Sequence, residues 1–120
     1  MTHPIRIARV YDPPDPSDGA RLLIDRLWPR GLAKATLRLD DWPVAVTPSA
    51  DLRRWFHADR TRWPEFVTRY RAELDAAPDV VSACLGWCRK GPVTLLTAAQ
   101  EVERCHATVL RDYLAERLAD

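Results

Sequence analysis

The stretch Pro92–Ala98, "PVTLLTA", limits the possible fold of this chain more than any other segment. It is short, almost entirely apolar and without strict alternation, a pattern typical of a strand buried on both faces of a parallel sheet. Along the chain, the expected order is strands, helices, this strand and a last helix. That order predicts an α/β fold, a single layered domain over residues 1–120 with a short, mostly parallel sheet flanked by helices.

Three earlier segments are expected to be extended. Ile5–Tyr11 alternates apolar and polar residues, which predicts a first strand. Ala20–Trp28 is a compact apolar run that we interpret as a second strand, although a short helix has a similar pattern. Between them, the prolines and the glycine of Asp12–Gly19 predict a stiff loop. Leu37–Val46 could form a third extended piece, which Pro43 limits to a sheet edge or a loop.

The middle and the end of the chain have the hydrophobic period of helices. Ser49 is a suitable N-cap for a short helix that follows it. A longer helix is expected in Arg60–Ala77, where the apolar residues form one stripe and Pro64 fits the first turn. Further helices are expected in Pro78–Gly91, which ends with a glycine, and in Glu101–Ala119.

Length, charge and cysteine content restrict the classes of function. The 120 residues suit one domain, and the formal net charge of +1 disfavours non-specific nucleic-acid binding, which usually needs a strongly basic domain. No apolar run reaches the ~20 residues of a membrane span, and the N-terminus lacks a signal-peptide pattern. We therefore expect a cytoplasmic protein with no membrane contact. The odd number of cysteines, three, predicts free thiols.

Polar side chains lie near the carboxyl ends of the predicted strands. They are Arg9 in the first strand, Asp25 and Arg26 in the second, Arg30 just after the second, and Thr97 at the end of the apolar one. Ligands of α/β proteins bind outside the carboxyl ends of parallel strands, and arginine suits bidentate contacts with phosphate and carboxylate. We therefore predict a crevice in which these five residues bind a small phosphate- or carboxylate-bearing ligand. Whether the protein is an enzyme stays open at this point.

Two alternatives to this crevice remain. Asp25 and the arginines could form a buried lattice of ion pairs that only stabilises the fold. The chain could also be a non-enzymatic module that binds nucleic acid or a protein partner through its helices, with Arg60, Arg62, Arg69 and Arg71 as the contacts. Acidic residues interleaved on the same helix favour ion pairs within the helix for these arginines.

A second group of candidate residues lies near the start of the last helix. A thiol near a helix N-terminus and arginines has a lowered pKa, so Cys105 could act as a catalytic nucleophile and His106 as its proton carrier. Alternatively, Cys105 packs in the core, since neighbouring helical residues point about 100° apart. Cys84 and Cys88 have a spacing that can serve a metal, but their apolar neighbours favour core packing, so we predict no metal site. His57 could line the mouth of a cavity.

Five blocks of the sequence resemble a known family. "RVYDPP", "DGARLLIDRLWPRG", "LRRWF", "RYRAEL" and "GPVTLLTAAQ" are similar, in this order, to the short YeaO-like members of the domain of unknown function family 488. The resemblance covers about Ile5 to Leu118. It implies a compact bacterial or archaeal α/β domain with a shared polar crevice that includes Arg26 and Arg30. It implies neither a reaction nor a cofactor, so the cofactor is unknown.

Longer members of the family have two polar motifs, to which this chain is similar only in part. Arg26 and Pro29 match an Asp-x-Arg-x-x-Pro element after a strand, and Cys105-His106 match a later Cys-His-Arg. Thr97 stands where the longer form has a strand-end cysteine, and Ala107 stands where it has the arginine. The resemblance therefore argues against a two-thiol metal or redox site in this chain.

Overall fold

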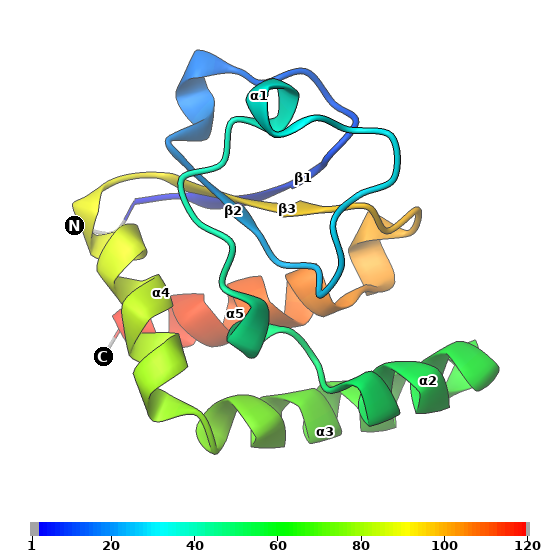
Figure 1. Cartoon of the computed structure of the whole chain (residues 1–120). Coiled ribbons are helices and arrows are strands. Elements are labelled where there is room, and N and C mark those ends of the chain that lie inside the picture. The colour runs from blue at the N-terminus through cyan, green and yellow to red at the C-terminus, as the bar shows by residue number, and fades with distance from the viewer. Residues whose placement is uncertain (1–2, 120) are drawn as a thin grey trace.

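Three parallel strands form the sheet at the centre of the molecule (Figure 1). The computed structural model describes residues 3–119. The strands are β1 (Ile5–Arg9), β2 (Ala20–Leu23) and β3 (Val93–Thr97), in the order β1-β3-β2, and β3 pairs in parallel with both neighbours. This arrangement confirms the predicted α/β class with a parallel sheet.

The central strand has the double burial that its sequence predicts. All five residues of β3 are buried. Leu95 enters a large core cluster on one face of the sheet, and Leu96 enters a smaller cluster on the other. In β2, Leu22 and Leu23 divide between the same two clusters. This alternation follows from the period of two in a strand, and it requires cover on both faces.

Five helices cover the sheet. They are α1 (Lys34–Leu37), α2 (Ala50–Ala58), α3 (Trp63–Asp75), α4 (Pro78–Lys90) and α5 (His106–Leu118). Figure 1 shows α2 to α5 on one side of the sheet, whereas the short α1 lies on the other side with the loops between the early elements. The described part of the chain also has four single turns of 3-10 helix: η1 (Pro16–Asp18), η2 (Val44–Val46), η3 (Arg60–Arg62) and η4 (Val102–Arg104).

The helix starts confirm the predicted signals. The Ser49 hydroxyl accepts a hydrogen bond from the Leu52 amide at 3.2 Å, which is the capping contact expected before α2. Pro64 lies in the first turn of α3, where a missing N–H costs nothing. At the other end of α4, Gly91 is the C-cap residue, with an extended backbone.

Two predicted boundaries are wrong, and Leu37–Val46 follows the loop alternative that Pro43 left open. Leu37–Val46 is not an extended piece, since it holds the end of α1 and the turn η2, and only an isolated bridge joins Asp41 to Leu22. Pro43 has no N–H to donate to a sheet, which agrees with this result. Strand β2 ends at Leu23, five residues before Trp28. The last helix begins at His106, after the separate turn η4.

Candidate functional site

A cavity of about 340 Å³ opens at the carboxyl ends of β2 and β3. Three segments form its walls: residues 24–30 after β2, residues 53–60 of α2 and the start of η3, and residues 97–106 between β3 and α5. Figure 1 shows these segments at the same end of the molecule. Carboxyl ends of neighbouring parallel strands meet at one edge of a sheet, so their loops converge there. Of the predicted site residues, Asp25, Arg26, Arg30, Thr97, Cys105 and His106 all line this cavity.

The carboxylate of Asp25 joins two walls of the cavity. It accepts hydrogen bonds from the Thr97 hydroxyl at 2.8 Å, from the Ala98 amide at 2.7 Å and from His106 at 3.0 Å. Burial opposes the charge of this carboxylate, but the hydrogen bond and charge of His106, with the two other donors, hold the pKa of Asp25 below its usual value. Asp25 is therefore an ionised group held in place from three sides.

The partners of His106 determine which of its ring nitrogens carries a hydrogen. Nε2 lies 2.9 Å from the Ile24 carbonyl oxygen and 3.0 Å from a carboxylate oxygen of Asp25. Both neighbours accept hydrogen bonds, so Nε2 must be the donor. Nδ1 has no hydrogen-bond partner among residues 3–119 and is not buried, so it is accessible to solvent. Nδ1 is an acceptor when the ring is neutral and a donor when the ring is protonated.

Arg26 has the one buried side-chain nitrogen without a partner among the described residues. This atom is Nε, while Nη2 donates a long 3.4 Å hydrogen bond to the Pro48 carbonyl. A buried unpaired donor costs about 1–3 kcal/mol, so it favours the arrival of an acceptor. Arg30 is exposed at the mouth, where its carbonyl accepts from the Tyr11 hydroxyl at 3.4 Å.

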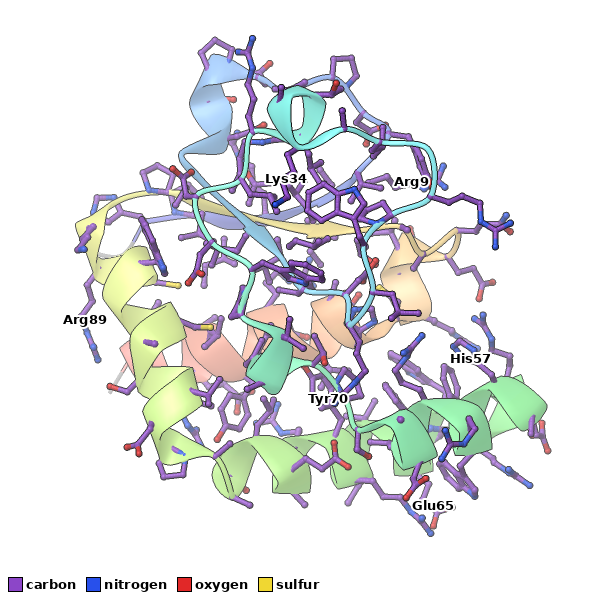
Figure 2. The ribbon with its side chains drawn as sticks, in the orientation of Figure 1. Arg9, Lys34, His57, Glu65, Tyr70 and Arg89 are labelled. Atoms are coloured by element: carbon purple, nitrogen blue, oxygen red, sulfur yellow. The ribbon has the colours of Figure 1, made fainter. Side chains whose placement is uncertain are left out.

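Asp25 takes no part in a lattice of ion pairs with arginines. Its one ion-pair partner within residues 3–119 is His106, and no guanidinium group lies within salt-bridge distance. Arg9 is turned elsewhere: its Nε donates to the Ala99 carbonyl at 3.2 Å, and its guanidinium lies over the Tyr11 ring. The structure places Arg9 outside the lining of the cavity, and Figure 2 shows it well apart from His57.

Cys105 is the N-cap residue of α5, and only 6% of its surface is exposed. Its thiol donates to the Val102 carbonyl at 3.3 Å. Burial raises the pKa of Cys105 despite the opposing amides of Ala107 and Thr108, which is the opposite direction from the one expected at a helix N-terminus. Its role as a nucleophile stays a prediction, and a neutral thiol is poorly suited to it.

The other two cysteines pack in the core. Cys84 and Cys88 are buried and free, as predicted, and burial raises the pKa of Cys84 to about 12. In the described part of the chain, no three His, Cys, Asp or Glu side chains lie close enough together to hold a metal ion. Within the same residues, no helix has the length and apolar character to cross a membrane.

The sequence interpretation placed His57 at the mouth of a cavity but missed the arginines that line the same wall. Arg53 and His57 on α2, with Arg60 at the start of η3, line the cavity, and so does Arg104 on η4. Figure 2 shows His57 rising from α2 on the side of the strand ends, whereas Glu65 points away from them. Arg53 and His57 are four residues apart on one face of α2, whereas Arg60 follows the extended residue Asp59 and reaches the cavity from η3, so helical spacing in the sequence does not group all three.

The pKa of His57 reports the charge of this wall. Partial burial and then the positive charges of Arg60 and Arg53 lower the pKa of His57 from its ordinary value, with a smaller effect from His106. The side chains of Arg30, Arg53 and Arg104 have no hydrogen bond or ion pair within residues 3–119, and Arg60 pairs with Glu101 at a long 3.5 Å. The wall therefore carries cations that are free to meet a ligand.

The arginines of α3 have partners of their own. Arg69 pairs with Glu65 in the same helix at 2.9 Å, which confirms the predicted kind of ion pair, and Arg71 pairs with Glu116 of α5 at the same distance. The guanidinium groups of Arg62 and Arg69 lie over the Trp55 ring. These contacts stabilise the packing of neighbouring helices.

Comparison with known proteins gives a family. A family model described as "Inactive DUF488-N3 subclade" matches residues 4–120, which confirms the resemblance in the sequence. The uncharacterised protein YeaO of Escherichia coli strain K12 is 43% identical over 110 residues, covering 92% of this chain and 96% of the relative. An uncharacterised protein of Mycobacterium tuberculosis strain H37Rv, Rv3073c, is 43% identical over 117 residues, or 94% and 95%. No solved structure matches the chain significantly.

Proposed function

This chain belongs to the DUF488 family, in a subclade described as inactive, and we propose that it binds a small phosphate- or carboxylate-bearing compound in the strand-end cavity without converting it. The observation that carries the proposal is the charge of the lining, in which five arginines face two carboxylates. The formal net charge of the chain is only +1, so this excess is local. A concave cationic site attracts anions more strongly than a flat surface of the same charge.

The hydrogen bonding of the lining supports the same conclusion. Three of the five guanidinium groups lack partners among residues 3–119, and Arg26 keeps a buried Nε that is unpaired within the same residues. Guanidinium groups bind phosphate and carboxylate through two parallel N–H donors. The hydrogen-bonded unit of Asp25, Thr97 and His106 holds the floor of the site rigid, which lowers the entropy cost of binding.

Binding is a better description of this site than catalysis. The subclade is described as inactive, and the buried Cys105 thiol, with its raised pKa, is poorly suited to nucleophilic attack. Nδ1 of His106 can still form a hydrogen bond with a ligand, as donor or acceptor according to the protonation of the ring. The alternative of a nucleic-acid- or protein-binding module has less support, because the arginines on α3 are engaged in ion pairs and stacking.

The proposal predicts that phosphate stabilises the protein through Arg53. At ten times its Kd, phosphate should add about 1.4 kcal/mol to the free energy of unfolding and raise the melting temperature by roughly 5 °C. Arg53→Gln should lose most of this rise. The measurement is thermal unfolding in a phosphate series at constant ionic strength.

Arg54→Gln is the matched control, because Arg54 neighbours Arg53 but points to solvent and pairs with Asp51. Phosphate also stabilises proteins non-specifically by exclusion from their surface, and that effect would be the same in both variants. An equal rise in the wild type and in both variants would therefore contradict anion binding in the cavity.

A further inference from the structure

The strand-end cavity is larger than an anion alone requires. Its volume of about 340 Å³ corresponds to roughly ten water molecules at ~30 Å³ each, and it falls in the range of sites for whole small molecules, about 300–1,000 Å³. A phosphate or carboxylate group fills only a small part of this space. The remaining surface of the cavity therefore indicates what the anionic group is attached to.

The exposed apolar residues at the mouth of the cavity lie on a different wall from the arginines of α2 and η3, whereas the buried Phe56 and Phe66 line its interior. Leu27 is 70% exposed and Tyr11 is 48% exposed, and both line the mouth beside Trp28. Trp42, the third large hydrophobic residue that is exposed in the described chain, contacts the Trp28 ring edge-on at 5.5 Å between centroids. Exposed leucine and aromatic side chains gathered at one mouth are typical of a binding surface.

The segment that carries this apolar wall is held in position. The indole nitrogen of Trp28 donates to the Leu32 carbonyl at 2.7 Å, and that of Trp42 donates to the Asp25 carbonyl at the same distance. The exposure of Leu27 is therefore a property of an ordered segment. A ring that entered the cavity would find this surface already formed, which reduces the entropy cost of binding.

We infer that the ligand carries its anionic group on a flat aromatic or heteroaromatic body, with the anion at Arg53, His57 and Arg60 and the ring against Leu27, Trp28 and Tyr11. This inference rests on the proposed function and deepens it by naming the class of ligand. Aromatic rings stack on one another and on leucine with more contact area than a flexible chain offers at the same entropy cost. The lowered pKa of His57 supports a positive potential where the anion lies.

Two classes of compound have this chemistry. One is the aromatic carboxylic acids and aromatic phosphates, and the other is the nucleotides. The test measures the affinity of the full-length protein by calorimetry for four probes: methyl phosphate, phenyl phosphate, ribose 5-phosphate and adenosine 5′-monophosphate. Phenyl phosphate should bind about tenfold or more tightly than methyl phosphate, since burial of a ring adds this much. The nucleotide should bind more tightly than ribose 5-phosphate only if the body is a nucleobase.

The variant Leu27→Ser distinguishes the contribution of the ring to the affinity from that of the anionic group. Leu27 is mostly exposed, so this variant should fold normally. It should lower the affinity for phenyl phosphate several-fold and leave that for methyl phosphate unchanged, whereas Arg53→Gln should weaken both. Equal affinities for phenyl and methyl phosphate, or a Leu27→Ser variant that binds both as the wild type does, would overturn the inference and leave the proposed function standing. Failure of all four probes to bind would overturn both.

Discussion

Replacing Gly19 by alanine should lower the free energy of unfolding by about 3 kcal/mol or more. Gly19 connects η1 to β2 with a φ of 66°, and an added Cβ would lie 2.1 Å from the Pro92 carbonyl oxygen. That oxygen cannot move away easily, because it accepts the Ala20 amide at 2.9 Å at the start of the β2–β3 pairing. Both the left-handed backbone and the close approach therefore require glycine at this position.

Urea unfolding of Gly19→Ala and of the matched variant Gly86→Ala tests this expectation. Gly86 lies within α4, and nothing lies within 4 Å of a Cβ added there. Alanine should therefore raise the free energy of unfolding by about 0.5–1 kcal/mol at Gly86. Equal free energies of unfolding for the two variants would contradict the close approach of Gly19 to the Pro92 carbonyl.

Removing the carboxylate of Asp25 should cost about 2–4 kcal/mol of stability at neutral pH. Asp25→Ala leaves the Thr97 hydroxyl and the Ala98 amide without their acceptor and removes the partner of His106. Asp51→Ala is the control, because Asp51 is a carboxylate in an ion pair on the surface, with 91% of its side chain exposed, and should cost less than about 1 kcal/mol. Comparable losses in the two variants would contradict the role of Asp25.

The effect of Asp25 should also depend on pH in one direction. Its pKa is lower in the folded protein than the usual 3.8, so the folded state favours the ionised form and the contribution is fully present above that value. It should be lost as the pH falls through the lower pKa of the folded state. Urea unfolding should thus give a difference between wild type and Asp25→Ala that shrinks as the pH is lowered below 4. A difference that grows as the pH falls below 4 would contradict the ionised, hydrogen-bonded carboxylate.

The main features of the fold were predictable because they depend on local patterns. The unbroken apolar run of β3 predicted a central buried strand, and the helical stripes with Ser49 and Pro64 predicted α2 and α3. Leu37–Val46 was not predictable in the same way. Its apolar residues pack into different parts of the core, with Leu37 in the small cluster and Val46 in the large one. Their spacing therefore resembles that of a strand, although no strand forms.

The candidate site was predictable in its floor and not in its cationic wall. Asp25, Thr97 and His106 follow strand ends or begin a helix, and parallel strands bring such positions together. Arg9 is the last residue of β1, but its guanidinium is engaged by the Ala99 carbonyl and the Tyr11 ring. The arginines of α2 and η3 reach the cavity through the packing of that helix against the core, which no local pattern specifies.

The most direct test of anion binding is the titration of His57, followed by nuclear magnetic resonance with and without phosphate. His57 faces Arg53 of α2, Arg60 of η3 and His106 of α5, and burial and these cations lower its pKa from the ordinary 6.5. Phosphate bound among them would favour the imidazolium form, so the pKa of His57 should rise toward or above 6.5, saturating with phosphate concentration. The resonances of His3, outside the cavity, should not respond. A His57 titration that is the same at every phosphate concentration would contradict an anion site in this cavity.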